Sequence, residues 1–297
     1  MPSPRSKPLG AALAAAVLGA VAALPALSGP AHAGDRAASV TAAGAAKPVN
    51  PCLNPVRRAG LYCPDLVMKA PIGLSLDRRV KRGRVVLRAG NSIDNIGLGP
   101  AELHGTRIGR RYMKGRQRIH RRNGTRLGID TGARLFFKFV PGQRRYWKFE
   151  RAADFTLWRL DSGGRRLRLV RRGPKVSYCL RDLFHSRPDR RRSPDQYVYP
   201  ACSTDAGERK VTIGTSAGWS DVYPPGYPEQ WIDVTGLRGC FSYQHTADPA
   251  NGVYESNEDN NSASVTVRLP FKPGRQRCSG GGTTSPGDGD NTDPYRY

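Results

Sequence analysis

Two separate segments carry side-chain oxygens that suit a hard cation. The residues concerned are Asp65, Glu255, Asn257, Asn260 and Asn261. Calcium binds several carboxylate and amide oxygens and accepts them from distant parts of a chain. This set therefore predicts a calcium site that would join the start of the folded region to its last strand. The alternative is a turn at residues 256–261 held by Asx hydrogen bonds, and the sequence leaves both interpretations open.

Residues of other types predict no second metal site or nucleophile. The histidines after residue 33 are His104, His120, His185 and His245, and no two lie two or four positions apart. A histidine site would therefore have to be assembled from distant positions. The cysteines form no CxxC pair, which argues against structural zinc. No nucleophile elbow or triad signature places Ser, His and Asp together.

Lys175 and Tyr223 stand in the two most distinctive segments of the chain. Residues 175–180 read Lys-Val-Ser-Tyr-Cys-Leu. Residues 218–235 begin with Gly-Trp-Ser-Asp-Val-Tyr and end with Gln-Trp-Ile-Asp-Val-Thr. Both segments resemble the core of the lysyl oxidases, in which a Lys and a Tyr at these positions are the precursors of a quinone cofactor.

Three further segments extend this resemblance in the same order along the chain. They are residues 63–67, 95–100 and 255–261. The likeness covers most of the region from residue 63 to residue 270. It implies a β-rich catalytic fold, a copper ion, and a lysine tyrosylquinone made from Lys175 and Tyr223. Some members of the family bind calcium at the segments that contain the oxygen-donor residues.

The family's copper ligands are replaced in this chain. The resemblance implies three His in an H-x-H-x-H run, where alternate residues of a strand put three imidazoles on one face. The ligand positions fall on Arg144, Tyr146 and Lys148. Arg144 stays charged and has no lone pair to donate, and Lys148 would first have to lose its proton. Two cations would also repel a copper ion by a few kcal/mol at an effective dielectric of about 20.

The register of that assignment depends on neighbouring residues. It is anchored by Trp147, Phe149, Glu150, Phe155 and Leu157. In the family, copper and dioxygen oxidise the Tyr ring before the Lys amine attacks it, so losing the copper would leave Tyr223 without an evident activator. The alternative to a quinone is structural: Lys175 as a surface residue at a strand end, and Tyr223 as a ring before the Pro224-Pro225 turn.

Short strands must position these residues. The candidates are Arg84–Ala89, Leu135–Val140, Tyr146–Glu150, Phe155–Leu160, Arg166–Val170, Val176–Leu180, Phe241–His245 and Ser264–Leu269. They are rich in β-branched and aromatic residues and are separated by Gly, Pro, Asn and Asp. No long stretch shows an apolar period of 3.6. The pattern predicts an all-β fold, an antiparallel sandwich or barrel like the lysyl oxidase catalytic domain.

The chain divides into four parts by composition. Residues 1–33 have the basic start, apolar run and small-residue cleavage site of a secretory signal peptide. We expect residues 34–50 to form a flexible mature N-terminus and residues 51–278 to form the β domain. We expect residues 279–297 to be a disordered tail. The protein is therefore expected to be secreted, extracellular or on the cell surface, with no membrane span after processing. The alternative is a membrane anchor at residues 9–27, although Pro25 interrupts that run and no second span follows.

Six cysteines fit an oxidising compartment. Sequence proximity favours the pairs Cys52–Cys63, Cys179–Cys202 and Cys240–Cys278. This scheme is a preference among about fifteen connectivities that six cysteines allow.

Positive charge dominates the composition. The formal net charge is +24, and removing Arg5 and Lys7 with the signal leaves +22. The cations gather in three clusters. These are Arg107, Arg110, Arg111, Lys114, Arg116, Arg118, Arg121, Arg122 and Arg126; then Arg165, Arg166, Arg168, Arg171 and Arg172; then Arg187, Arg190, Arg191 and Arg192. Such clusters favour an anionic cell-wall polymer or another polyanion.

A polyanion partner is not the only interpretation of this charge. A solvated basic surface without a dedicated partner explains the composition equally well. No motif for reading a nucleic-acid sequence accompanies the clusters, so sequence-specific recognition is not expected. The sequence does not predict an oligomeric state.

Three functions follow from these observations. The first is a secreted lysyl-oxidase-like protein without the family's copper site, hence a pseudoenzyme that binds an anionic surface. The second is an active copper- and quinone-dependent amine oxidase that deaminates lysine side chains or other primary amines. The third is an unrelated secreted β module with an accidental likeness.

Overall fold

Strands make up almost all of the regular structure. The computed structural model describes residues 47–274, 278–279 and 283–284. In this part of the chain the one helix, α1 (Pro55–Arg58), is a single turn. Asn54 caps it by accepting a hydrogen bond from the Arg57 amide at 3.0 Å, and Pro55 occupies a first-turn position that needs no amide donor. The predicted all-β, antiparallel fold is confirmed.

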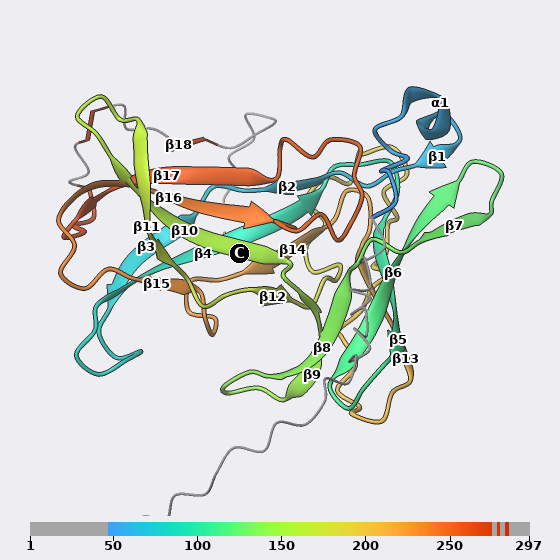
Figure 1. The fold of residues 1–297 in the computed structure, drawn as a ribbon, viewed down its shortest axis with the longest axis horizontal. Coiled ribbons are helices and arrows are strands. Elements are labelled where there is room, and N and C mark those ends of the chain that lie inside the picture. Colours follow the sequence, from blue (N-terminus) through green and yellow to red (C-terminus); the bar gives the residue numbers. More distant parts are fainter. Residues whose placement is uncertain (1–46, 275–277, 280–282, 285–297) are drawn as a thin grey trace, which may run out of the picture. The chain divides into compact units, whose positions relative to one another are not determined.

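The largest sheet contains eight strands among the described residues and carries the first basic cluster. Its order is β12–β9–β8–β6–β5–β13, and β1 and β7 also pair with β6. The bounds are β1 (Leu61–Tyr62), β5 (Ala101–Arg107), β6 (Tyr112–Arg121), β7 (Arg126–Ile129), β8 (Arg134–Phe139), β9 (Arg145–Glu150), β12 (Ser177–Tyr178) and β13 (Lys210–Thr215). In Figure 1 most of these strands lie on the right, crossing the direction of the others.

Two smaller sheets complete the domain. One has the order β11–β10–β16–β17–β18. Its bounds are β10 (Ala153–Leu160), β11 (Arg166–Arg172), β16 (Gly239–Ala247), β17 (Ser262–Leu269) and β18 (Thr283–Thr284). The other has the order β14–β4–β15, with β2 and β3 also paired to β4. Its bounds are β2 (Leu66–Met68), β3 (Ile72–Asp77), β4 (Val86–Asn95), β14 (Ser220–Tyr223) and β15 (Trp231–Asp233).

Strand β4 brings the two halves of the 218–235 segment together. β15 pairs with the first part of β4, where Trp231 lies opposite Arg88. β14 pairs with its second part, where Tyr223 lies opposite Asn91. The Pro-Pro turn between β14 and β15 therefore lies beside the middle of a ten-residue strand. This geometry fixes the backbone of Tyr223.

Residues 63–67 and 95–100, which the sequence links only by resemblance, lie side by side. The Leu98 amide donates to the Cys63 carbonyl at 2.9 Å, and the Ile96 amide to the Asp65 carbonyl at 2.8 Å. A Cβ at Gly99 would lie 2.0 Å from the Tyr62 carbonyl oxygen. Only glycine lets the two backbones approach this closely.

One large hydrophobic core fills the space between the sheets. It includes Trp147, Phe149, Phe155, Tyr178 and Tyr243, all with at most 2% of their surface exposed. A smaller cluster surrounds the Cys52–Cys63 disulfide. The three disulfides are those favoured by the sequence: Cys52–Cys63, Cys179–Cys202 and Cys240–Cys278.

The predicted strands are found, with shifted ends. β4 begins at Val86 and runs on to Asn95, and the predicted strand at 176–180 shortens to Ser177–Tyr178. The candidate strands did not include β1, β2, β3, β5, β6, β7, β13, β14, β15 and β18. In β6, buried and outward-facing residues alternate as in an ordinary strand. Two of the buried positions are Gly115 and Gln117, however, so the sequence shows little alternation of apolar and polar residues.

Parts of the predicted boundaries lie outside the described residues, including the whole signal peptide at 1–33. At the start of the described chain, the Lys47 amine donates to the Ala250 carbonyl at 2.8 Å, and Asn50 to the Glu255 carbonyl at 3.1 Å. Within the predicted tail, Thr283–Thr284 pairs with β17. The helical part of the described chain contains nothing long and apolar enough to cross a membrane.

Candidate functional site

Lys175 lies completely buried beneath three tyrosine rings. Its Nζ is 4.2 Å from the ring centre of Tyr223, 4.4 Å from that of Tyr227 and 4.7 Å from that of Tyr178. The interpretation of Lys175 as a surface residue is therefore wrong, because none of its surface is exposed. The fold brings Lys175 and Tyr223 into contact across 48 positions of sequence, because β12 packs beside β14 through their shared tyrosines.

The Tyr223 ring is held on several sides. Its hydroxyl accepts a hydrogen bond from the Cys179 amide at 3.2 Å. Its ring packs edge-on against Tyr178 at 4.4 Å and against Tyr227 at 4.8 Å. Burial and the nearby Asp221 raise the pKa of Tyr223 well above its usual value, so the phenol is neutral at neutral pH.

Lys148 is the second buried lysine of this cluster. Its Nζ lies 3.5 Å from the Tyr146 hydroxyl and 6.0 Å from the Tyr227 ring centre. Burial, together with the positive charge of Lys138, lowers the pKa of Lys148 to about 8. Burial and the charge of Lys148 in turn lower the pKa of Lys175 well below its usual value. Among the described residues, the Lys175 Nζ has no hydrogen-bond partner.

Asp221 is the acidic member of the cluster. It is fully buried, and its side-chain hydrogen-bond partner is Tyr223. Burial raises the pKa of Asp221 to about 8, although Arg181, Lys175 and Lys148 act in the opposite direction. A carboxyl group with such a pKa can hold or release a proton near neutral pH. The sequence prediction did not include Asp221. Its position two residues before Tyr223 could have indicated it, because alternate residues of a strand face the same side.

A pocket of about 410 Å³ opens beside these residues. The rings of Tyr146, Tyr223 and Tyr227 form one wall, and the Cys179–Cys202 disulfide contributes to another. Tyr146 and Tyr227 are joined by a hydrogen bond between their hydroxyls, and Gln143 bonds to both, at 3.0 and 2.8 Å. Tyr223 and Tyr227 line the pocket and also contact the buried Lys175 amine.

The three residues at the expected copper positions do not suit a copper ion. Arg144 lies exposed on the hairpin at the pocket, and the Tyr146 hydroxyl is engaged with Tyr227. The Lys148 amine lies near the charge of Lys138, and the buried Lys175 amine belongs to the same cluster. Within residues 47–274, 278–279 and 283–284, no three His, Cys, Asp or Glu side chains are arranged to hold a metal ion.

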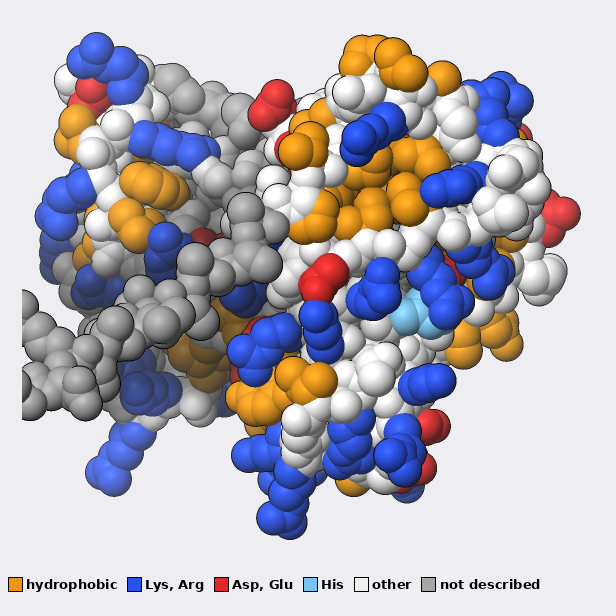
Figure 2. All heavy atoms as spheres, turned by 45° about the vertical axis from the view of Figure 1, so that its right-hand side comes forward, with side chains coloured by type: hydrophobic (Ala, Val, Ile, Leu, Met, Phe, Trp, Pro, Cys, Tyr) orange, Lys and Arg blue, Asp and Glu red, His pale blue; other side chains and the backbone are white. Residues whose placement is uncertain are grey.

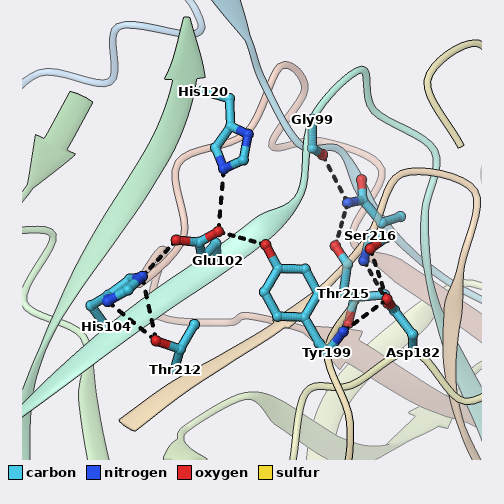
Figure 3. A network of polar contacts seen from close by, with 10 residues as sticks. Gly99, Glu102, His104, His120, Asp182, Tyr199, Thr212, Thr215 and Ser216 are labelled. Carbon is cyan, nitrogen blue, oxygen red and sulfur yellow. Dashed lines mark hydrogen bonds and ion pairs between the residues drawn. The ribbon is translucent and has the colours of Figure 1, made fainter. Parts of the chain in front are cut away.

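Two histidines that are far apart in the sequence, His104 and His120, contact the same carboxylate, that of Glu102. Glu102 accepts hydrogen bonds from Tyr199 at 2.6 Å and contacts ring nitrogens of His104 at 2.6 Å and His120 at 3.2 Å (Figure 3). Burial alone would raise the pKa of Glu102, but these three contacts outweigh it and hold the pKa well below its usual range. Tyr199 connects this group to the segment that carries Asp182.

Asp182 holds the segment that precedes β14 in place through hydrogen bonds. Its carboxylate accepts hydrogen bonds from the Ser216 amide at 2.6 Å and the Ser216 hydroxyl at 2.7 Å (Figure 3). It also accepts from the Val198 and Tyr199 amides, at 2.8 and 3.2 Å. This network sets the start of the segment that delivers Asp221 and Tyr223 to the pocket.

The predicted calcium residues are brought together only in part. Asp65 accepts from Asn260 at 2.7 Å, and Glu255 accepts from Asn261 at 2.9 Å. Asn257 is exposed and accepts from the Asp259 amide at 3.0 Å. The segment thus contains the hydrogen-bonded turn that was the alternative to calcium.

Several oxygens in the same region nevertheless have no partner among the described residues. They are Oε2 of Glu258 and Oδ1 of both Asn260 and Asn261. Burial, with the neighbouring charges of Asp248 and Glu258, raises the pKa of Glu255 well above its usual value. The sequence prediction did not include Glu258.

Comparison with known families agrees with the motif assignment. The sequence profile of the family described as Lysyl oxidase matches residues 106–275, more than half of the 297-residue chain. This range contains Lys175, Tyr223 and the Arg144–Lys148 run. A search of curated proteins gave no match.

Proposed function

This chain belongs to the lysyl oxidase family, and we propose that it is a secreted member that binds an anionic surface and lacks the family's copper-dependent activity. One observation supports the loss of activity above all. The Lys148 amine, and not an imidazole, reaches into the cluster around Lys175 and Tyr223. A cation there opposes a metal cation and offers it no ready lone pair. The three disulfides fit an oxidising compartment.

The positive surface supports the anionic partner. Figure 2 brings the β5–β6–β7 side forward and shows Lys and Arg side chains over much of this face, with few Asp and Glu. Outward residues of β6 and its turn contribute to this charge, including Arg116, Arg121, Arg122 and Arg126, all exposed. Guanidinium groups in such a row suit the repeated phosphates or carboxylates of a cell-wall polymer.

Retention on a phosphate-rich polymer tests the binding function. We expect the purified protein to adsorb to teichoic-acid-type polymer at low salt and to be released as salt rises, because each neutralised phosphate liberates a counterion. A binding constant that does not change with salt, or adsorption no stronger than that of a neutral secreted protein, would contradict the proposal.

An active amine oxidase is the second candidate, and one observation favours it. The Lys175 amine already lies over the Tyr223 ring, and that ring borders a pocket open to small molecules. The residues fit the precursors of the quinone, whereas those at the ligand positions do not fit copper. When present, the quinone would supply the electron-accepting carbonyl chemistry of the family.

Elemental analysis and peptide mapping distinguish the two candidates. Protein secreted in the presence of ample copper is expected to carry no stoichiometric copper and to give no quinone redox stain. Lys175 and Tyr223 should appear in separate, unmodified peptides. A single cross-linked peptide, together with deamination of an alkylamine, would establish the oxidase instead.

Calcium binding at Glu255 is proposed as a stabilising addition. Its support is the group of buried oxygens without partners and the raised pKa of Glu255, both of which a cation would relieve. We expect millimolar calcium, but not magnesium, to raise the unfolding temperature. The increase should disappear in Glu255→Gln, while the exposed control Asp189→Asn keeps it. An equal unfolding temperature with calcium and with a chelator would leave the hydrogen-bonded turn as the explanation.

A further inference from the structure

The proposed function leaves a set of reactive groups without a role. Lys175, Lys148 and Asp221 are each at most 1% exposed, and their charges act on one another. Removing charged groups from water is costly, so this arrangement lowers the stability of the fold. The rings of Tyr223 and Tyr227, which contact Lys175, also line the 410 Å³ pocket. Such a combination is typical of a site for chemistry.

We propose that the pocket binds small aldehydes and that the Lys175 amine joins them in a reversible imine. The proposal rests on the proposed function in one respect, since Lys175 must be a free amine and not part of a quinone. It needs no metal and no redox partner.

The surroundings of Lys175 favour a neutral, nucleophilic amine. Burial and the adjacent Lys148 lower its pKa. Enzymes activate lysines for imine formation by these same two means, an apolar environment and a second cation nearby. The pKa of Lys148 is lowered to about 8, so at pH 7 this neighbour still carries most of its positive charge.

Access to Lys175 depends on the tyrosine wall. Its Nζ touches the faces of Tyr223 and Tyr227, and both of these rings line the pocket. Tyr227 is only half-buried and belongs to the turn between β14 and β15. In the described part of the chain, its hydroxyl is hydrogen-bonded to Tyr146 and Gln143. Rotation of this one ring would connect the amine with the pocket.

The reaction balances within this cluster. The Lys175 nitrogen adds to the carbonyl carbon and forms a carbinolamine. The carbon–oxygen bond then breaks, water leaves, and a carbon–nitrogen double bond forms, with no net oxidation or reduction. Asp221 has a pKa of about 8, so it can give a proton to the departing hydroxyl and receive the one lost from nitrogen.

Reductive trapping tests the proposal on the intact secreted protein. Peptide mapping first establishes that Lys175 and Tyr223 are separate; a cross-link at this stage would contradict the proposed function, not the chemistry of a free Lys175. The protein is then treated with butanal and cyanoborohydride at pH 7, and butylation is followed at each lysine. The exposed Lys81 and Lys210 serve as internal references.

We expect Lys175 to be butylated at least tenfold faster than either reference. An ordinary exposed lysine is neutral to only about one part in a thousand or less at pH 7. Tyr227→Phe keeps the ring but loses the hydroxyl contacts, and should accelerate the labelling of Lys175. Lys148→Met removes the neighbouring cation and should slow it at pH 7.

Two results would overturn the proposal. One is butylation of Lys175 no faster than that of Lys81 in both the natural protein and Tyr227→Phe, since the variant removes the hydrogen bonds that hold the Tyr227 ring in place. The other is faster butylation of Lys148 than of Lys175, which would show that Lys148, and not Lys175, is the nucleophile. Circular dichroism of each variant verifies that the comparison is made on folded protein.

Discussion

At the residue scale, the chemistry of the site depends on charges that have been removed from water. Lys175, Lys148 and Asp221 carry pKa values displaced toward neutrality because burial disfavours the charged form of each. The same displacement weakens the fold, since a group that must give up its preferred charge state opposes folding. Buried ionisable groups that lower the stability of the fold are common at functional sites and uncommon elsewhere.

Asp221→Asn should stabilise the protein, increasingly as pH rises. The pKa of Asp221 is about 8 in the fold and about 4 when unfolded, so between these values the native state binds the extra proton. Stability of the natural protein therefore falls as pH rises from about 4 to 8, and the variant avoids this loss. We expect a gain of about 1–4 kcal/mol at pH 7 that vanishes near pH 4.

Urea unfolding at several pH values measures this difference. The exposed Asp189→Asn is the matched control and should follow the natural protein at every pH. A constant offset between Asp221→Asn and the natural protein across the pH range would show that the carboxyl titrates normally.

At the element scale, short strands and buried polar contacts deliver the site residues. β14 is only four residues long, yet it carries both Asp221 and Tyr223 because β4 supports it along its whole length. Before β14, the Asp182 network holds residues 182, 198–199 and 216 together. Glu102 links this segment to β5 and β6 through Tyr199 and His120.

Glu102→Gln should loosen this connection. The pKa of Glu102 is depressed in the fold, so its contribution to stability is present above about pH 4 and is lost as pH falls. Losing charge-assisted hydrogen bonds of this kind costs about 2–4 kcal/mol at neutral pH. Thermal unfolding at pH 7 and at pH 3.5 should show a large deficit at the first and a smaller one at the second. An equal deficit at both would assign the effect to packing.

At the scale of the whole molecule, exposed cations differ in how many of them are paired with acidic or polar side chains. On β11 and beside it, Arg165 pairs with Asp161, and Arg172 with Asp154. Arg166 donates to Gln244, Ser242 and Ser264. The β6–β7 face presents a longer row of cations on a single surface. Long-range attraction of a polymer is therefore expected to act mainly there.

Removing three charges from each cluster tests this asymmetry. The triple variant Arg116→Gln, Arg118→Gln and Arg126→Gln should lower the slope of log affinity against log salt by about 2–3 on phosphate polymer. The control variant Arg165→Gln, Arg166→Gln and Arg172→Gln loses the same formal charge and should change the slope by less than 1 unit, roughly. Equal losses would indicate that net charge alone governs binding.

The sequence by itself determined the family and the β class, and it favoured the cysteine pairs that the structure contains. These follow from local patterns: ordered motifs around Lys175 and Tyr223, short runs of β-branched and aromatic residues, and cysteines close together along the chain. The resemblance also predicts that Arg144 and Lys148 stand where the family has imidazoles, a prediction that needs residue identity and no coordinates.

Only the tertiary structure decided what those residues face. Burial and proximity arise from contacts between distant segments, which no local pattern encodes: β12 and β14 meet across the core, and so Lys175 lies beneath Tyr223 and not on the surface. The same packing removes water from Lys148 and Asp221 and thereby moves their pKa values. The packing also brings His104 and His120 to the same carboxylate, that of Glu102. Their spacing in the sequence does not predict this contact.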